Sequence, residues 1–165
     1  ISTAGTEASG TSNMKFALNG GLIIGTLDGA NIEIAQEIGK DNMFIFGSLA
    51  EEVEDIRHNQ RYRNIPLNPD LSQVLEAIKG GQFGDYSIYA PLIDTLTIGG
   101  DFYLISNDFK SYLEAQSKAD ECFKNKQEWT RRSILSTARM GKFSSDRCIR
   151  EYASQIWKLR PCPLP

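Results

Sequence analysis

Two short apolar segments with a helical pattern between them constrain the fold of this chain most strongly. Residues 22–27 and 43–46 are rich in branched and aromatic side chains, and glycines follow both within two residues. Segments of this length and composition are typical of strands buried on both faces of a parallel sheet. Apolar residues recur at helical spacing over 32–38, so the sequence predicts a compact strand–helix–strand unit.

Beyond residue 47 the apolar pattern is mostly helical. A short strand is predicted over 102–105, and helices are predicted over 49–56, 71–79, 88–96, 108–124, 126–139 and 145–158. Polar side chains in front of these helices are expected to cap them. The expected caps are Asn31, Ser48 paired with Glu51, Asp70, and either Asn107 or Asp108. Pro91 is expected in the first turn of its helix, where proline is tolerated.

The segment from residue 7 to residue 19 carries the residues most suited to chemistry. Gly10 followed by Thr11 and Ser12 predicts a helix entrance whose small side chains leave backbone N–H groups open to a phosphate. Lys15 follows Thr11 by four residues, so both project from one helix face. Pyridoxal phosphate has a phosphate at one end and an amine-reactive aldehyde at the other, and a lysine is its usual attachment. The pattern therefore suggests a phosphate-plus-lysine site.

Each of these residues also has a simpler interpretation. A lysine on a helix is usually a solvated surface residue, and Glu7 is also explained as an acid interacting with the helix dipole. Ser9 and Thr11 are also explained as ordinary caps, and the apolar residues at helical spacing in this segment as core contacts. The residues alone leave both interpretations open.

The composition excludes several classes of function. A net charge of −3 and a pI near 5.2 argue against nucleic acid as the main partner. No apolar run approaches the roughly 20 residues of a membrane-spanning helix. His58 is the only histidine, so histidine triads and multi-histidine zinc sites would need residues from elsewhere. The three cysteines lack Cys-x-x-Cys spacing, and we expect reduced thiols in a cytosolic protein.

The segment at 7–19, EASGTSNMKFALN, resembles the pyridoxal-phosphate attachment signature of the α-glucan (glycogen and starch) phosphorylases without a gap. The similarity continues through the ranges 25–33, 44–47, 128–130 and 141–147. Residues 57–103 resemble the family only loosely, so no role is carried over to them.

The resemblance implies a role for each matched residue. Lys15 matches the lysine that binds pyridoxal phosphate covalently and is the expected catalytic residue. Thr11 and Ser12 match the positions that hold the 5′-phosphate, although many relatives have glycine where Ser12 stands. The loop that hydrogen-bonds the hydroxyls of the transferred glucosyl unit is matched by Glu7, Ala8, Ser9 and Gly10. No metal site is implied.

The family has the glycosyltransferase-B architecture, in which two Rossmann-like domains face each other across a cleft. The resemblance implies that 1–165 is the C-terminal portion of the C-terminal, cofactor-binding domain. Residues 1–47 would carry the cofactor helix and the strand–helix–strand unit, and residues 48–165 would be mainly helical. The expected fold class is therefore α/β, with short parallel strands followed by a mostly helical region. Because the chain begins with Ile1 rather than Met, we expect an inactive fragment whose last helix, 145–158, crosses to the missing N-terminal domain.

The implied reaction is the reversible phosphorolysis of α-1,4-glucan by orthophosphate, a hexosyl transfer that gives glucose 1-phosphate with retention of configuration. In this family the cofactor phosphate is the general acid, so Lys15 serves mainly as an anchor. The lack of a glycosidase carboxylate pair near Glu7 fits that chemistry. The resemblance also implies an allosteric, cytoplasmic homodimer, and the charge and hydropathy described above predict no nucleic-acid or membrane partner.

Two other functions remain open. One is a pyridoxal-phosphate enzyme of amino-acid metabolism, which needs an aspartate near the ring nitrogen and an arginine for the substrate carboxylate. No local motif identifies either residue. The other is a non-catalytic phosphate-binding α/β module, which would keep the helix entrance without depending on Lys15.

Overall fold

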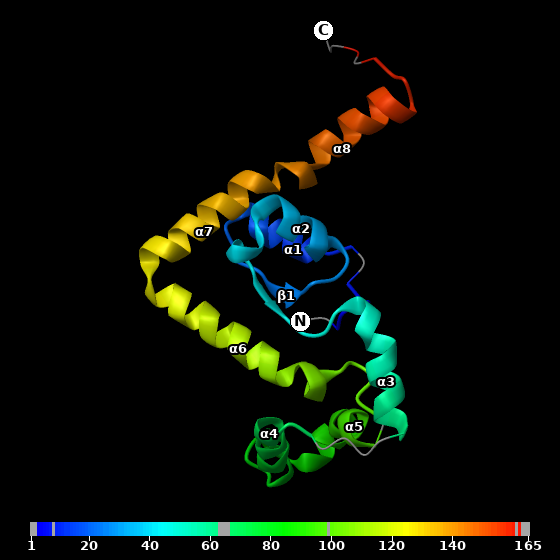
Figure 1. Ribbon diagram of the computed structural model, residues 1–165, viewed down its shortest axis with the longest axis vertical. Coiled ribbons are helices and arrows are strands. Elements are labelled where there is room, and N and C mark those ends of the chain that lie inside the picture. The colour runs from blue at the N-terminus through cyan, green and yellow to red at the C-terminus, as the bar shows by residue number, and fades with distance from the viewer. Residues whose placement is uncertain (1–2, 8, 63–66, 99, 161, 163–165) are drawn as a thin grey trace.

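The structure, a computed structural model, describes residues 3–7, 9–62, 67–98, 100–160 and 162 (Figure 1). Its first part holds α1 (Thr11–Leu18), β1 (Ile24–Thr26), α2 (Ala30–Ile38), the 3₁₀ turn η1 (Lys40–Asn42) and β2 (Phe44–Phe46). The helical remainder comprises η2 (Ala50–Glu52), α3 (Val53–Tyr62), α4 (Pro69–Lys79), α5 (Tyr86–Thr97), α6 (Ile105–Lys124), α7 (Lys126–Arg139), η3 (Met140–Phe143), α8 (Ser145–Glu151) and the π-helical turn η4 (Tyr152–Ile156).

The strand–helix–strand unit is confirmed. β1 and β2 pair in parallel with Ile24 opposite Phe44 and Thr26 opposite Phe46, and α2 connects them. Both strands lie within the predicted segments but are shorter, and among the described residues no further strand follows β2. The α/β class with short parallel strands and a mostly helical remainder is therefore confirmed as well.

Side chains of β2 point alternately to two cores, as expected of a strand covered on both faces. On one side, α1, α2 and η3 contribute to a cluster that contains Ala17, Ile34, Ile38 and Met140, all at most 1% exposed. Ile45 packs against this cluster from the strand. Because Ala17 belongs to it, the helix that carries the predicted site is anchored in the main core.

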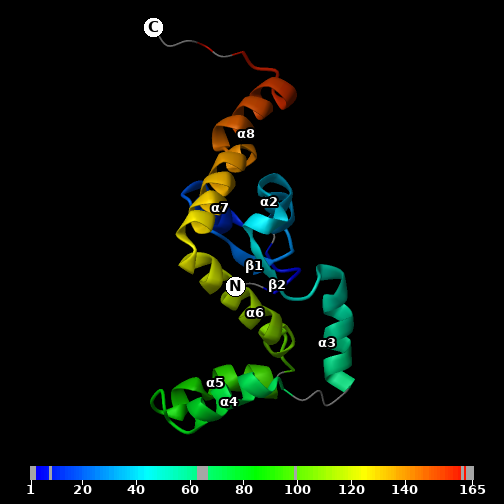
Figure 2. The ribbon, with the colours of Figure 1, turned by 60° about the vertical axis from the view of Figure 1, so that its left-hand side comes forward.

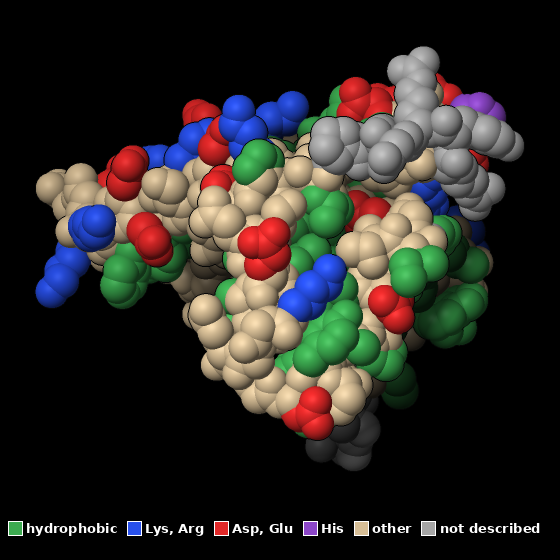
Figure 3. Space-filling view, turned by 90° about the horizontal axis from the view of Figure 1, so that it is seen from below, with side chains coloured by type: hydrophobic (Ala, Val, Ile, Leu, Met, Phe, Trp, Pro, Cys, Tyr) green, Lys and Arg blue, Asp and Glu red, His purple; other side chains and the backbone are tan. Residues whose placement is uncertain are grey.

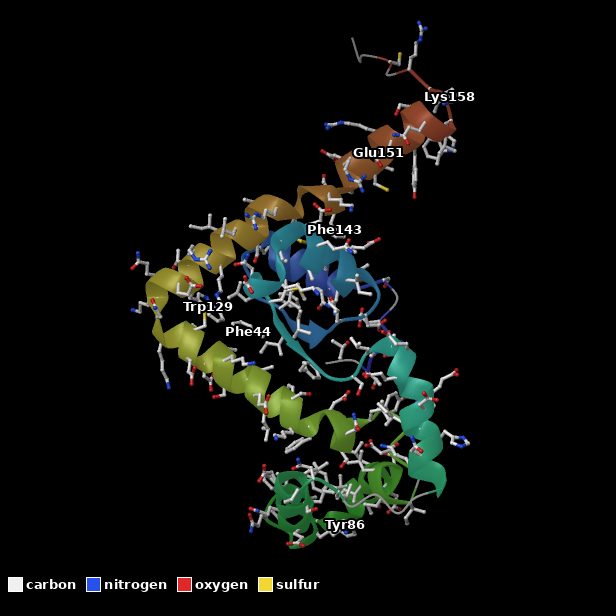
Figure 4. The ribbon with its side chains drawn as sticks, in the orientation of Figure 1. Phe44, Tyr86, Trp129, Phe143, Glu151 and Lys158 are labelled. Atoms are coloured by element: carbon white, nitrogen blue, oxygen red, sulfur yellow. The ribbon has the colours of Figure 1, made fainter. Side chains whose placement is uncertain are left out.

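The opposite side of β2 faces α6. Phe44 and Phe46 pack with small residues of that helix, Ala115 and Ala119. Trp129, at the start of α7, stacks on Phe44 with 6.5 Å between ring centroids, and Figure 4 shows the two side chains between the strand and the helix. The sheet is thus sandwiched between α1 and α2 on one face and α6 on the other (Figures 1 and 2).

The helical remainder extends from this sandwich in two directions. The α4–α5 hairpin lies at one end with its own cluster of Leu71, Leu75 and Ile93, and α8 projects from the other end (Figure 1). Hydrophobic side chains are visible on the face seen from the α4–α5 end (Figure 3). On α5, Ile88 and Leu92 are exposed within the described chain.

Several predicted caps are wrong. Asn31 lies inside α2, which begins after Gly29, and Asn68 rather than Asp70 caps α4. Ser48 is not part of a capping box with Glu51, because its N–H and hydroxyl both donate to Asp108. A polar side chain near a helix start can hydrogen-bond to several backbone or side-chain groups. The spacing of residues in the sequence does not show which of these groups it binds.

The region around residue 102 also differs from the prediction. Residues 102 and 103 form a turn rather than a strand, and α6 begins at Ile105 after Leu104, which has φ 55°. Neither Asn107 nor Asp108 caps this helix; Asp101 does, accepting hydrogen bonds from the N–H groups of Ile105 and Ser106.

Two further helix predictions need correction. Pro91 lies in the interior of α5 rather than in its first turn. The α-helix expected over 145–158 ends at Glu151 and continues as the π-helical turn η4. By contrast, α7 has the predicted bounds and is capped by Asn125, whose side chain accepts from the Glu128 N–H.

Candidate active site

The entrance to α1 depends on Gly10. This residue has φ 55° and is buried, and a Cβ at its position would lie 2.8 Å from the Cβ of Ala30. The left-handed conformation and the close approach to α2 both favour glycine. The predicted helix entrance after Gly10 is confirmed, and α2 fixes where it lies.

The start of α1 presents backbone N–H groups that have no hydrogen-bond partner among the described residues. The first intrahelical hydrogen bond runs from the Met14 N–H to the Gly10 carbonyl at 3.0 Å, so the three preceding amides have no carbonyl one turn earlier. Thr11 and Ser12 are exposed, and each carries a hydroxyl group in this first turn. Free amides, hydroxyls and the positive end of the helix dipole together suit an anion such as a phosphate.

Lys15 is the basic group of this helix face. Its side chain is exposed, and it follows Thr11 by four positions in the helix, which is about 6 Å along the axis. In the part of the chain that the structure describes, Lys15 forms no salt bridge, so its amine is available to a ligand. An amine beside an anion site matches the two reactive ends of pyridoxal phosphate, and the donor set fits that cofactor.

The loop before Gly10 folds back on itself and on the β1–α2 connection. The Glu7 N–H donates to Oδ2 of Asp28 at 2.9 Å, and the Gly10 N–H donates to Oε1 of Glu7 at 3.0 Å. Ser9 is exposed, whereas Ala8 lies outside the described residues. The structure thus brings Glu7, Ser9 and Gly10 to the entrance of the helix that carries Thr11, Ser12 and Lys15.

The contacts that hold α1 against α2 were missed by the sequence analysis. Nδ2 of Asn13 donates to Oδ1 of Asn31 at 2.8 Å, and Nδ2 of Asn31 donates to the Thr26 carbonyl at 3.0 Å. The fully buried Asn31 therefore links α1 to the end of β1. Asn31 is a polar residue on the inward face of an otherwise apolar helix pattern. This feature of the sequence could have indicated that its side chain forms buried hydrogen bonds.

A second unpredicted contact comes from the far end of the chain. The Ser133 hydroxyl donates to the Gly20 carbonyl at 2.8 Å, and the Thr137 hydroxyl donates to the Ala17 carbonyl at 3.1 Å. Both acceptors lie at the C-terminal end of α1, where helix carbonyls lack intrahelical donors. Helix α7 therefore holds the C-terminal end of α1, while α2 holds its beginning.

Other kinds of site find little support in the described chain. It contains no group of three or more histidine, cysteine or acidic residues placed to hold a metal, and none of its helices is long and apolar enough to cross a membrane. No disulfide joins Cys122 and Cys148. A cavity of about 490 Å³ lies beside Thr3 and Thr6, and no predicted site residue that the structure describes lines it. The candidate site is instead an open surface at the entrance of α1.

Comparison with known proteins identifies what this surface resembles. The family described as "Carbohydrate phosphorylase" matches residues 1–159. A glycogen phosphorylase of Saccharomyces cerevisiae is 54% identical over 98% of this chain, and an alpha-glucan phosphorylase of Arabidopsis thaliana described as cytosolic is 51% identical over the whole of it. A glycogen phosphorylase of Synechocystis is 50% identical over 98%. The chain spans 18–20% of the length of these relatives.

Proposed function

The chain belongs to the carbohydrate phosphorylase family, and from this premise we propose that it forms one wall of the active site of an α-glucan phosphorylase. The proposed reaction is the reversible phosphorolysis of α-1,4-glucan by orthophosphate, which yields glucose 1-phosphate. The observation that carries the proposal is the exposed Lys15, one turn beyond the free amides that begin α1.

Two groups of residues divide the binding work in this proposal. Lys15 holds pyridoxal phosphate covalently, and Thr11, Ser12 and the first amides of α1 hold its 5′-phosphate. The loop of Glu7, Ala8, Ser9 and Gly10 binds hydroxyl groups of the glucosyl unit that is transferred. A carboxylate and backbone groups suit sugar hydroxyls because these hydroxyls both donate and accept hydrogen bonds.

The cofactor, when bound, supplies a phosphate group able to act in acid–base catalysis. The residues of this chain orient the cofactor and do not take over the acid–base role of its phosphate. Lys15 prevents the cofactor from dissociating, and the helix dipole of α1 favours its negative charge. Glu7 orients the sugar through a hydroxyl, so that its ring is presented to the reacting phosphate.

The remaining parts of the active site lie outside this chain in the proposal. The facing N-terminal domain closes the cleft and excludes water, and the remaining basic residues around the cofactor phosphate also lie outside this chain. Family membership further suggests a cytoplasmic homodimer subject to allosteric regulation.

Chemical labelling tests the role of Lys15 directly. The full-length protein is treated with borohydride, which makes a lysine–pyridoxal linkage permanent, and is then digested and mapped. We expect the label on Lys15, and we expect Lys15→Ala to lose bound pyridoxal and to reduce phosphorolysis by at least about a hundredfold. Lys15→Arg serves as the matched variant, because it keeps the positive charge but cannot form the linkage.

The alternatives give different results in the same experiments. Label at Lys15 with activity on amino acids rather than on glucan plus phosphate would indicate an enzyme of amino-acid metabolism. Phosphate binding without any label would indicate a non-catalytic module. Retention of cofactor and full phosphorolysis in Lys15→Ala would overturn the proposal.

A further inference from the structure

The connection between β1 and α2 places a buried carboxylate directly behind the loop of residues 7–10. Asp28 is 7% exposed, and its Oδ2 accepts a hydrogen bond from the Glu7 N–H, 21 residues away in the sequence. Glu7 lies before α1, and Asp28 lies between β1 and α2. A carboxylate that is hidden from solvent and bonded to the loop backbone is in a position to determine where that loop lies.

A carboxylate just before a helix usually caps that helix, but Asp28 does not. The N-cap of α2 is Gly29, and no side-chain hydrogen bond caps the helix; the Asn31 N–H instead donates to the backbone carbonyl of Asp28. Within the described residues, Asp28 also forms no salt bridge, and the hydrogen bond that its carboxylate accepts comes from the Glu7 N–H. Because a buried carboxylate is costly to leave unpaired, the bond to Glu7 is strongly favoured.

Glu7 is consequently held at two points. The Asp28 carboxylate accepts a hydrogen bond from the Glu7 N–H. Oε1 of Glu7 in turn accepts a hydrogen bond from the N–H of Gly10, three residues later. Oε2 of Glu7 accepts no hydrogen bond from the described residues and remains available to a ligand. The position of that free oxygen relative to Thr11 and Lys15 therefore depends on the Asp28 contact.

We propose that Asp28 is a positioning residue that sets the place of the Glu7 carboxylate for recognition of the sugar. The inference rests on the proposed function, in which Glu7 binds a hydroxyl of the glucosyl unit. Asp28 itself touches neither substrate nor cofactor and acts through the Glu7 backbone. Its removal should weaken recognition of the sugar more than retention of the cofactor.

The kinetic test compares three variants of the full-length protein. We expect Asp28→Ala to raise the KM for glucose 1-phosphate and to lower kcat/KM by about 10- to 100-fold, with bound pyridoxal unchanged. Asp28→Asn keeps an oxygen acceptor for the Glu7 N–H and should stay within about fivefold of the wild type. Glu33→Ala is the matched control, since it removes an exposed carboxylate from the first turn of α2 without touching the loop.

A double-mutant comparison tests whether Asp28 acts through Glu7. If it does, Asp28→Ala should cost little in a Glu7→Ala background, because the positioned carboxylate is already gone. Effects that simply add would overturn the inference. An unchanged kcat/KM in Asp28→Ala, with an active wild type, would overturn it while leaving the proposed function intact. A wild type that lacks glucan phosphorolysis would instead overturn the proposed function.

Hydrogen exchange supplies a readout that does not depend on activity. Exchange at the Glu7 amide should accelerate in Asp28→Ala and be restored in Asp28→Asn, while the Met14 amide inside α1 stays protected. Loss of cofactor in Asp28→Ala without a change at the Glu7 amide would show that the residue acts elsewhere, and would contradict the inference.

Discussion

Gly10 joins the loop of residues 7–10 to α1 and carries two separate constraints. Its φ of 55° lies in the left-handed region, and Ala30 occupies the space that a side chain would need. The first constraint concerns the backbone conformation alone, whereas the second concerns packing between α1 and α2. A side chain at this position would therefore disturb the site through either effect.

We expect Gly10→Ala to destabilise the fold by about 2 kcal/mol or more and to weaken cofactor binding, because the added Cβ would push α1 away from α2. Gly5→Ala separates the two effects, since Gly5 has φ 81° but nothing within 4 Å of an added Cβ. Urea unfolding of both variants measures the difference. Equal destabilisation would show that backbone conformation alone accounts for the requirement.

At the scale of elements, the start of α6 concentrates two buried acids. Asp101 caps the helix, and Asp108 in the first turn of α6 accepts hydrogen bonds from the N–H and hydroxyl of Ser48. Burial raises the pKa of the Asp101 carboxyl above its usual 3.8, and repulsion by Asp108 adds to the rise, while hydrogen bonds from Ser106 and Ile105 oppose it. The Asp101 carboxyl is therefore protonated more readily in the folded chain than in the unfolded chain.

This shift predicts how stability changes with pH. The folded state holds the Asp101 proton more tightly than the unfolded state does. The contribution of this proton to the free energy of unfolding is therefore complete below pH 3.8 and is lost as the pH rises through the folded pKa of Asp101. We expect the free energy of unfolding of the wild type, relative to Asp101→Asn, to fall over that interval in urea titrations. In an Asp108→Asn background the fall should move to lower pH. A relative stability that rises with pH would contradict the assignment.

At the scale of the whole molecule, the chain closes on itself through α7 and η3. Met140 is fully buried in the same cluster as Ala17 of α1 and Ile34 of α2, more than 100 residues away. Lys142 at the end of this segment also pairs with Glu37 of α2 at 2.9 Å, an exposed contact of small energetic value. The packing of Met140 is the stronger link between the two ends of the fold.

We expect Met140→Ala to lower the free energy of unfolding by about 2–5 kcal/mol, because it leaves a cavity under α1. Ile134→Ala is the control on the same stretch of chain, since Ile134 of α7 is 61% exposed and should cost less than about 1 kcal/mol. Thermal and urea unfolding give the two values. Similar losses in both variants would show that α1 does not depend on the C-terminal segment.

Much of the local structure could be predicted from the sequence. The strands, α1, α2 and α7 follow from apolar periodicity within a few neighbouring residues, and the spacing of Thr11 and Lys15 on one helix face requires no tertiary information. The helix entrance at Gly10 was also predicted from neighbouring residues, because Thr11 and Ser12 follow this glycine. The family resemblance is confirmed by relatives about half identical over the whole chain.

Tertiary structure decided which partner each polar group takes. Ser48, Asp28 and Asn31 all stand near helix starts, where local spacing predicts caps or gives no signal, yet they bind Asp108, Glu7 and Asn13. The physical reason is competition: a polar side chain has several acceptable local partners, and packing selects among them. The sequence alone therefore determined the helix, the lysine and the helix entrance that we propose binds phosphate, whereas the folded chain determined how α2 and α7 hold them in place.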